Sequence, residues 1–77
     1  KAKPDPEIFL LASQKLNIAP QNCLVIEDAE KGIVAAHRAG MKSIAIPNEY
    51  TTDNDFSLAN VRLKDIKEIT LDLIKKI

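Results

Sequence analysis

The residues Cys23 to Ile26 form an apolar run that leads directly into two acids, Glu27 and Asp28. Residues 29–39 then have the composition of a helix, and Gly40 stands where a left-handed C-terminal cap is expected. A four-residue apolar run between turn-forming residues predicts a strand that is buried on both faces. Such strands occur in parallel sheets covered by helices, so this stretch restricts the chain to an α/β fold.

The rest of the chain supplies the other elements of such a fold. We predict a helix that begins at Pro6 with Asp5 as its N-cap and ends at Asn17, strands over residues 43–46 and 61–63, and a final helix over residues 65–76. Strands that alternate with helices imply parallel pairing through right-handed crossovers. The predicted fold class is therefore α/β, with a Rossmann-like, open, doubly wound parallel sheet of three strands flanked by helices.

Composition limits the classes of partner. The 77 residues amount to one small domain, and 45% hydrophobic with 29% charged residues is typical of a soluble globular protein. Lysine plus arginine and aspartate plus glutamate both number 11, so the chain has no basic surface for nucleic acid or an anionic membrane. No apolar run approaches the roughly 18 residues that a membrane span needs. The single cysteine, Cys23, predicts a reduced, cytoplasmic setting.

The predicted sheet has an unusual edge. If the three strands follow one another in one direction, residues 23–26 lie at an edge, yet they carry none of the charges, prolines or bulges that protect edge strands. We therefore expect that the neighbouring strand is absent, and that residues 1–77 are the C-terminal segment of a larger core domain. The missing N-terminal half of that core is the expected partner of this edge, and a homodimer through the exposed edge is the alternative.

The two acids lie where open α/β sheets bind ligands, beyond the carboxyl end of a strand. Two adjacent carboxylates suit Mg²⁺, although Asp28 has the alternative role of an N-cap for the following helix, which leaves Glu27 unexplained. Lys3 is held out of helical geometry by Pro4, and its side chain either reaches this edge or is simply solvated. Gly32 is expected to allow close packing of the helix on the sheet.

The segments AKPDPEIF (residues 2–9) and CLVIEDAEKGIVAAHRAGM (residues 23–41) together resemble the C-terminal half of the haloacid dehalogenase-like phosphohydrolases. They are most similar to the branch that contains β-phosphoglucomutase and small sugar-phosphate phosphatases, and the resemblance is good up to about residue 50. It implies that Lys3 is a catalytic, phosphate-binding lysine that neutralises the transferring phosphoryl group. It also implies that Glu27 and Asp28 hold Mg²⁺ directly or through water.

Several sequence elements of this family are absent from the chain. The family's nucleophile is the first aspartate of a D-x-D element after an N-terminal strand, and the only D-x-D here, Asp53-Asn54-Asp55, lies in a polar loop. The family's serine or threonine phosphate-binding element and its cap domain are also missing. The resemblance implies part of a magnesium-dependent phosphatase that uses an aspartyl-phosphate intermediate on a small phosphorylated metabolite such as a sugar phosphate, with the 77 residues alone inactive. The alternatives are a sugar phosphomutase and a non-catalytic binding module that keeps the scaffold.

Overall fold

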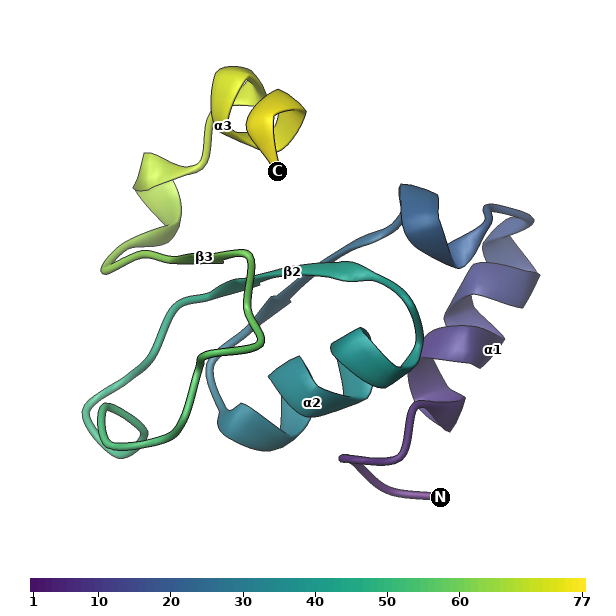
Figure 1. Cartoon of the computed structure of the whole chain (residues 1–77), viewed down its shortest axis with the longest axis horizontal. Helices are drawn as coiled ribbons and strands as arrows, with labels where there is room; N and C mark the ends of the chain where they lie inside the picture. The colour runs from purple at the N-terminus through teal and green to yellow at the C-terminus, as the bar shows by residue number, and fades with distance from the viewer.

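A three-stranded sheet flanked by helices organises the chain, and the computed structural model describes residues 1–77 (Figure 1). In chain order the elements are α1 (Glu7–Leu16), the 3-10 helix η1 (Pro20–Asn22), β1 (Leu24–Glu27), α2 (Glu30–Arg38), β2 (Lys42–Ala45), β3 (Val61–Arg62), the 3-10 helix η2 (Ile66–Glu68) and α3 (Leu71–Lys76). The strands are all parallel, in the order β1-β2-β3. The predicted α/β class and parallel sheet are confirmed.

The register of the sheet determines where the functional residues lie. β1 and β2 pair along their whole length, from Leu24 opposite Lys42 to Glu27 opposite Ala45. Because both strands end at the same level, the residues that follow β1 lie beside the loop that follows β2. β3 pairs only with the second half of β2, which leaves β1 as one edge of the sheet, as predicted.

The core lies between α2 and the sheet. Ile33 and Ile44 are completely buried, and so are three small residues, Ala35, Ala36 and Ala45. Ala35 and Ala36 keep α2 thin, so that the helix approaches the strands closely. Full burial of one isoleucine stabilises the fold by about 1.5–3 kcal/mol. α2 and α3 lie on opposite sides of the strands in Figure 1.

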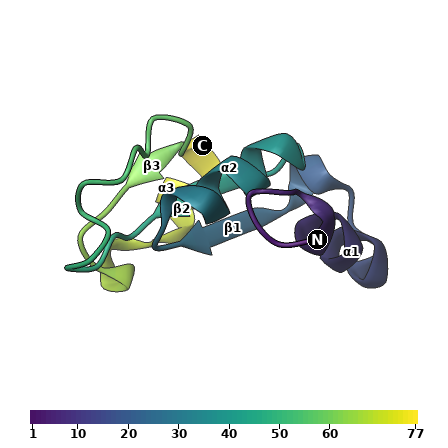
Figure 2. The ribbon, with the colours of Figure 1, turned by 90° about the horizontal axis from the view of Figure 1, so that it is seen from below.

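The N-terminal region extends the molecule beyond the amino end of β1. α1 lies past the tail of the β1 arrow, and the residues before α1 extend back toward the arrowhead (Figure 2). The prediction that this helix begins at Pro6 with Asp5 as its N-cap is wrong by one residue, because the helix begins at Glu7 and its N-cap is Pro6. Asp5 Oδ1 still accepts a hydrogen bond from the Glu7 N–H at 2.9 Å. Asn17 ends α1 in the left-handed conformation, with φ 55°. At ten residues α1 is the longest helix, and no helix combines the length and apolarity required to cross a bilayer.

The final helix differs from its prediction. In place of one helix over residues 65–76, η2 and α3 are separated by a break at Ile69 and Thr70. The Asp65 side chain accepts a hydrogen bond from the Lys67 N–H, and Glu68 completes a capping box. The Thr70 side chain accepts from the Leu73 N–H and starts α3 as a new helix. Two N-caps within six residues favour two short helices over one long helix.

An apolar surface remains uncovered along β1 and α1. The prediction that β1 is buried on both faces is wrong for this chain, because Ile26 on its outer face is 45% exposed. Leu16, the last residue of α1, is 65% exposed. A groove of about 280 Å³ lies between the two elements, and eight of its nine lining residues are hydrophobic. The groove and the unpaired strand edge are the features that a neighbouring strand would cover. That such a strand is missing remains a prediction.

This edge leads to a prediction about self-association. The 77-residue chain on its own should form a two-fold dimer through β1, because the unpaired N–H and C=O groups are a template for a second strand. Ile26→Lys should weaken the dimer, since it places a charge on the edge without burying it. Leu71→Lys, at a residue that is 74% exposed and far along the chain, is the matched control. Sedimentation analysis of the three proteins measures the effect, and a folded monomer at high micromolar concentration with protected amides in β1 would contradict the prediction.

Candidate functional site

An ion pair joins the N-terminal segment to the carboxyl end of β1. Lys3 Nζ donates a hydrogen bond to Glu27 Oε2 at 2.9 Å, across 24 positions of the sequence. The Lys3 and Glu27 side chains are 34% and 17% exposed, and the ammonium group also lies 5.3 Å from the centre of the Phe9 ring. Lys3 is therefore not a freely solvated lysine. A partly exposed pair of this kind contributes at most about 1 kcal/mol to stability.

Asp28 lies next to this pair but makes a different contact. Its Oδ2 accepts a hydrogen bond from Asn48 Nδ2 at 3.0 Å, whereas its Oδ1 accepts none. The N-cap of α2 is Ala29, and no side chain of the cap residue bonds to the helix. The alternative role of Asp28 as an N-cap is therefore wrong. The carboxylate remains exposed, with one oxygen free to bind a ligand.

The loop after β2 performs the capping instead. Asn54 Oδ1 accepts a hydrogen bond from the Glu30 N–H at 3.0 Å, and Glu30 Oε1 accepts one from the Asp55 N–H at 2.9 Å. These two bonds hold the loop against the first turn of α2. Neither Asn48 nor Asn54 was predicted as part of the site. The one feature of the sequence that could have indicated Asn48 is its place just after the carboxyl end of β2. Ligands of open α/β sheets bind beyond that end of the strands.

The D-x-D sequence of the loop does not form a second acidic site. Asp53 and Asp55 are both exposed. Asp55 Oδ1 accepts a hydrogen bond from the Ser57 N–H at 2.9 Å, and hydrogen bonds from Ser57 lower the pKa of the Asp55 carboxyl below its ordinary value. These bonds are local to the turn and place the carboxylate in no cluster.

The donor atoms at the end of β1 suit a hard cation but do not surround one. Nowhere in the chain do three or more histidine, cysteine, aspartate or glutamate side chains gather so that they could hold a metal ion. Glu27 and Asp28 alone supply carboxylate oxygens here. Mg²⁺ usually takes one or two protein carboxylates and completes its octahedron with water and substrate phosphate. The site fits that pattern, with further ligands still required.

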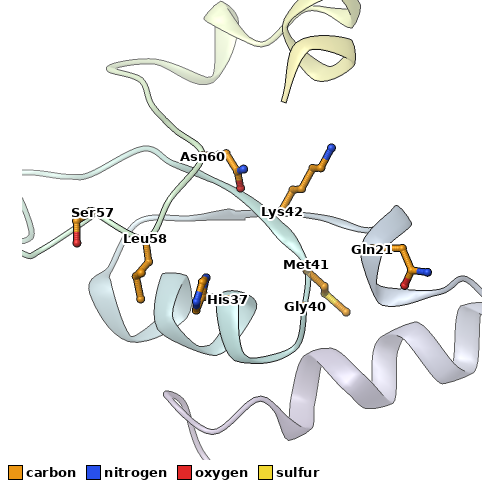
Figure 3. A pocket seen from close by; sticks show the side chains of 8 residues that line it. All are labelled: Gln21, His37, Gly40, Met41, Lys42, Ser57, Leu58 and Asn60. Atoms are coloured by element: carbon orange, nitrogen blue, oxygen red, sulfur yellow. The ribbon is translucent and has the colours of Figure 1, made fainter.

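A second hollow lies at the opposite end of the sheet. It has a volume of about 450 Å³ and lies around the amino end of β2 (Figure 3). Its lining residues are Gln21, His37, Gly40, Met41, Lys42, Ser57, Leu58 and Asn60. The lining contains no carboxylate and none of the residues predicted for the site.

Comparisons with known proteins agree with the α/β fold described above. The family model described as haloacid dehalogenase-like hydrolase matches residues 1–40. Hexitol phosphatase B of Escherichia coli O157:H7 is 39% identical over 70 residues, which cover 90% of this chain and 32% of that protein.

Two solved structures have a fold similar to that of this chain. CbbY from Rhodobacter sphaeroides in complex with phosphate is 34% identical with a TM-score of 0.85, over 88% of this chain and 30% of that one. β-Phosphoglucomutase from Clostridium difficile is 36% identical with a TM-score of 0.83, over 99% of this chain and 32% of that one. The chain thus spans about a third of the length of each of these proteins. Because the family match includes Lys3, Glu27 and Asp28 and extends over more than half of the residues, the chain belongs to the haloacid dehalogenase-like hydrolases.

Proposed function

We propose that this chain is the C-terminal part of a magnesium-dependent phosphatase that acts on a small phosphorylated metabolite, a sugar phosphate. The observation that carries the proposal is the Lys3–Glu27 ion pair at 2.9 Å, beside the exposed Asp28, at the ligand-binding edge of a parallel sheet. The similarity to a hexitol phosphatase, and to a protein solved in complex with phosphate, supports the substrate class. The free thiol of Cys23 supports a cytoplasmic location.

The geometry suggests a division of roles between the two acids. Asp28 has an exposed carboxylate with a free oxygen, so it would be the residue that holds Mg²⁺. Glu27 holds Lys3 and would add its negative charge to the same site. Lys3 places a positive charge where the phosphoryl oxygens gather negative charge during transfer. When bound, Mg²⁺ would neutralise further charge on those oxygens.

The nucleophile comes, on this proposal, from outside the 77 residues. An aspartate at the carboxyl end of a strand paired with the free edge of β1 would stand beside Glu27 and Lys3. Its carboxylate would attack phosphorus, displace the alcohol and form an acyl phosphate that water then hydrolyses. The uncovered edge of β1 and the apolar groove beside it support this placement.

A sugar phosphomutase is the second candidate, and the similarity to β-phosphoglucomutase favours it. The two activities differ in the fate of the phosphoryl group, which passes to water in a phosphatase and back to the sugar in a mutase. Incubating the complete protein with β-glucose 1-phosphate and Mg²⁺ separates them. Free phosphate identifies the phosphatase, and glucose 6-phosphate identifies the mutase.

The proposal is tested at Lys3. In the complete protein, Lys3→Ala should lower the kcat for p-nitrophenyl phosphate about 10- to 150-fold, because a charge-assisted contact of about 1.5–3 kcal/mol is lost from the transition state. The melting temperature should change little, since Lys3 fills no cavity in the core and its ion pair is partly exposed. Lys15→Ala, at an exposed lysine of α1 without an ion pair, is the matched control. Normal turnover with a lowered melting temperature would make Lys3 a structural residue.

A further inference from the structure

Gly32, in the first turn of α2, lies directly against the Glu27 side chain. A Cβ atom built on Gly32 would stand 1.6 Å from Glu27 Oε1, 2.1 Å from its Cδ and 2.5 Å from its Cγ. The three nearest atoms therefore all belong to one side chain, and real Cβ atoms essentially never approach another atom so closely. The expectation of close packing is met, but the partner is the functional carboxylate at the strand end rather than the sheet backbone.

The carboxylate is held between two elements. Glu27 Oε2 accepts the hydrogen bond from Lys3, while Oε1 occupies the space beside Gly32. Any side chain at position 32 would force Glu27 into another rotamer, and the Lys3–Glu27 contact would be lost with it. The helix itself does not call for glycine, because Gly40 is the only glycine with a positive φ and glycine weakens a helix relative to alanine.

We propose that Gly32 is a positioning residue for the reaction. Because it has no side chain, Gly32 leaves room for Glu27 Oε1 beside α2, and so determines where the Glu27 carboxylate and, through it, the Lys3 ammonium group stand. The effect on turnover rests on the phosphatase proposed above, whereas the effect on the ion pair does not depend on any activity.

A double-mutant cycle in the complete protein tests the proposal. The four proteins are the unaltered one, Gly32→Ala, Glu27→Ala and the double variant. Two properties are measured: the hydrolysis of p-nitrophenyl phosphate with Mg²⁺, and the ¹H–¹⁵N NMR signal of the Lys3 ammonium group without metal, which exchanges slowly with water only when a carboxylate holds it. Gly32→Ala should abolish that signal and lower kcat/KM about 10- to 100-fold, the usual size of effect when a residue that orients a functional group is lost.

In the Glu27→Ala background, Gly32→Ala should change turnover less than about 2-fold. The three Glu27 atoms that would clash with a Cβ at position 32 (Oε1, Cδ and Cγ) are absent from that background. The melting temperature there should stay equal or rise, because alanine favours the helix. If Gly32→Ala does not fold, a folded double variant still assigns the clash to Glu27. An unchanged ammonium signal in Gly32→Ala, an equal loss of turnover in both backgrounds, or unfolding in both backgrounds would overturn the proposal. If the unaltered protein hydrolyses no phosphate ester, the proposed function fails, and the ammonium signal alone decides the role of Gly32.

Discussion

The 77-residue chain alone should show no hydrolysis of p-nitrophenyl phosphate, with or without Mg²⁺. Covalent phosphoryl transfer needs an aspartate in line with phosphorus, and none of the carboxylates near Lys3 is free for that role. Glu27 is bound to Lys3, and Asp28 is the proposed metal ligand. Asp53 and Asp55 lie on an exposed turn, where Asp55 is bound to Ser57.

The measurement compares the pure chain with the complete protein at equal concentration and saturating Mg²⁺. The complete protein is the positive control, and the Lys3→Ala form of the chain identifies any contaminating phosphatase, because a contaminant would be unaffected by that change. Magnesium-dependent hydrolysis by the chain that Lys3→Ala abolishes would show that a nucleophile lies within these residues, and the proposed source of the aspartate would then be wrong.

Asp28→Asn in the complete protein should lower kcat about 100-fold, or about 2.7 kcal/mol in the transition state, at ordinary Mg²⁺ concentration. The amide has nearly the shape of the carboxylate, and its oxygen can still accept the hydrogen bond from Asn48. What changes is the negative charge, which a proposed Mg²⁺ ligand needs. Raising the Mg²⁺ concentration should recover part of the lost turnover, because the change weakens binding of the ion more than it alters the geometry around it.

The dependence of kcat on Mg²⁺ concentration is the deciding measurement. Asp53→Asn is the matched control, since it removes the same charge from an exposed acid of the loop after β2. That variant should follow the curve of the unaltered protein. Unchanged turnover of Asp28→Asn at low Mg²⁺ would show that Asp28 is not a ligand.

The sequence was sufficient to predict the elements at the centre of the fold but not all of their ends. The apolar run before Glu27 predicted β1 within one residue, because a strand buried by a helix must be apolar whatever its neighbours are. The edge position of β1 was also predicted correctly. The extent of the final helix was wrong, since the capping preference of Thr70 outweighed the helical spacing of the apolar residues around it.

The candidate site could be predicted only in part, because its contacts join distant segments. The role of Asp28 was left open between a cap and a ligand, and the structure rejects the cap because Asn54 Oδ1, 24 positions after Glu30, accepts the hydrogen bond from the Glu30 N–H. Composition and spacing do not reveal such a bond. Whether the Lys3 side chain reaches the carboxyl edge of the sheet or is solvated was also left open, and its ion pair with Glu27 was not predicted. The reason for Gly32 became visible only when the side chain beside it was placed.

The pleat of β1 has a consequence for how the chain tolerates insertions and deletions. Val25 is buried whereas Ile26 is 45% exposed, so alternate residues face opposite sides of the sheet, and Glu27 shares the side of Val25 that α2 covers. One residue added or removed within β1 would turn Glu27 away from α2 and bring an apolar neighbour into its place. The length of this strand is therefore under stricter constraint than the identity of its apolar residues.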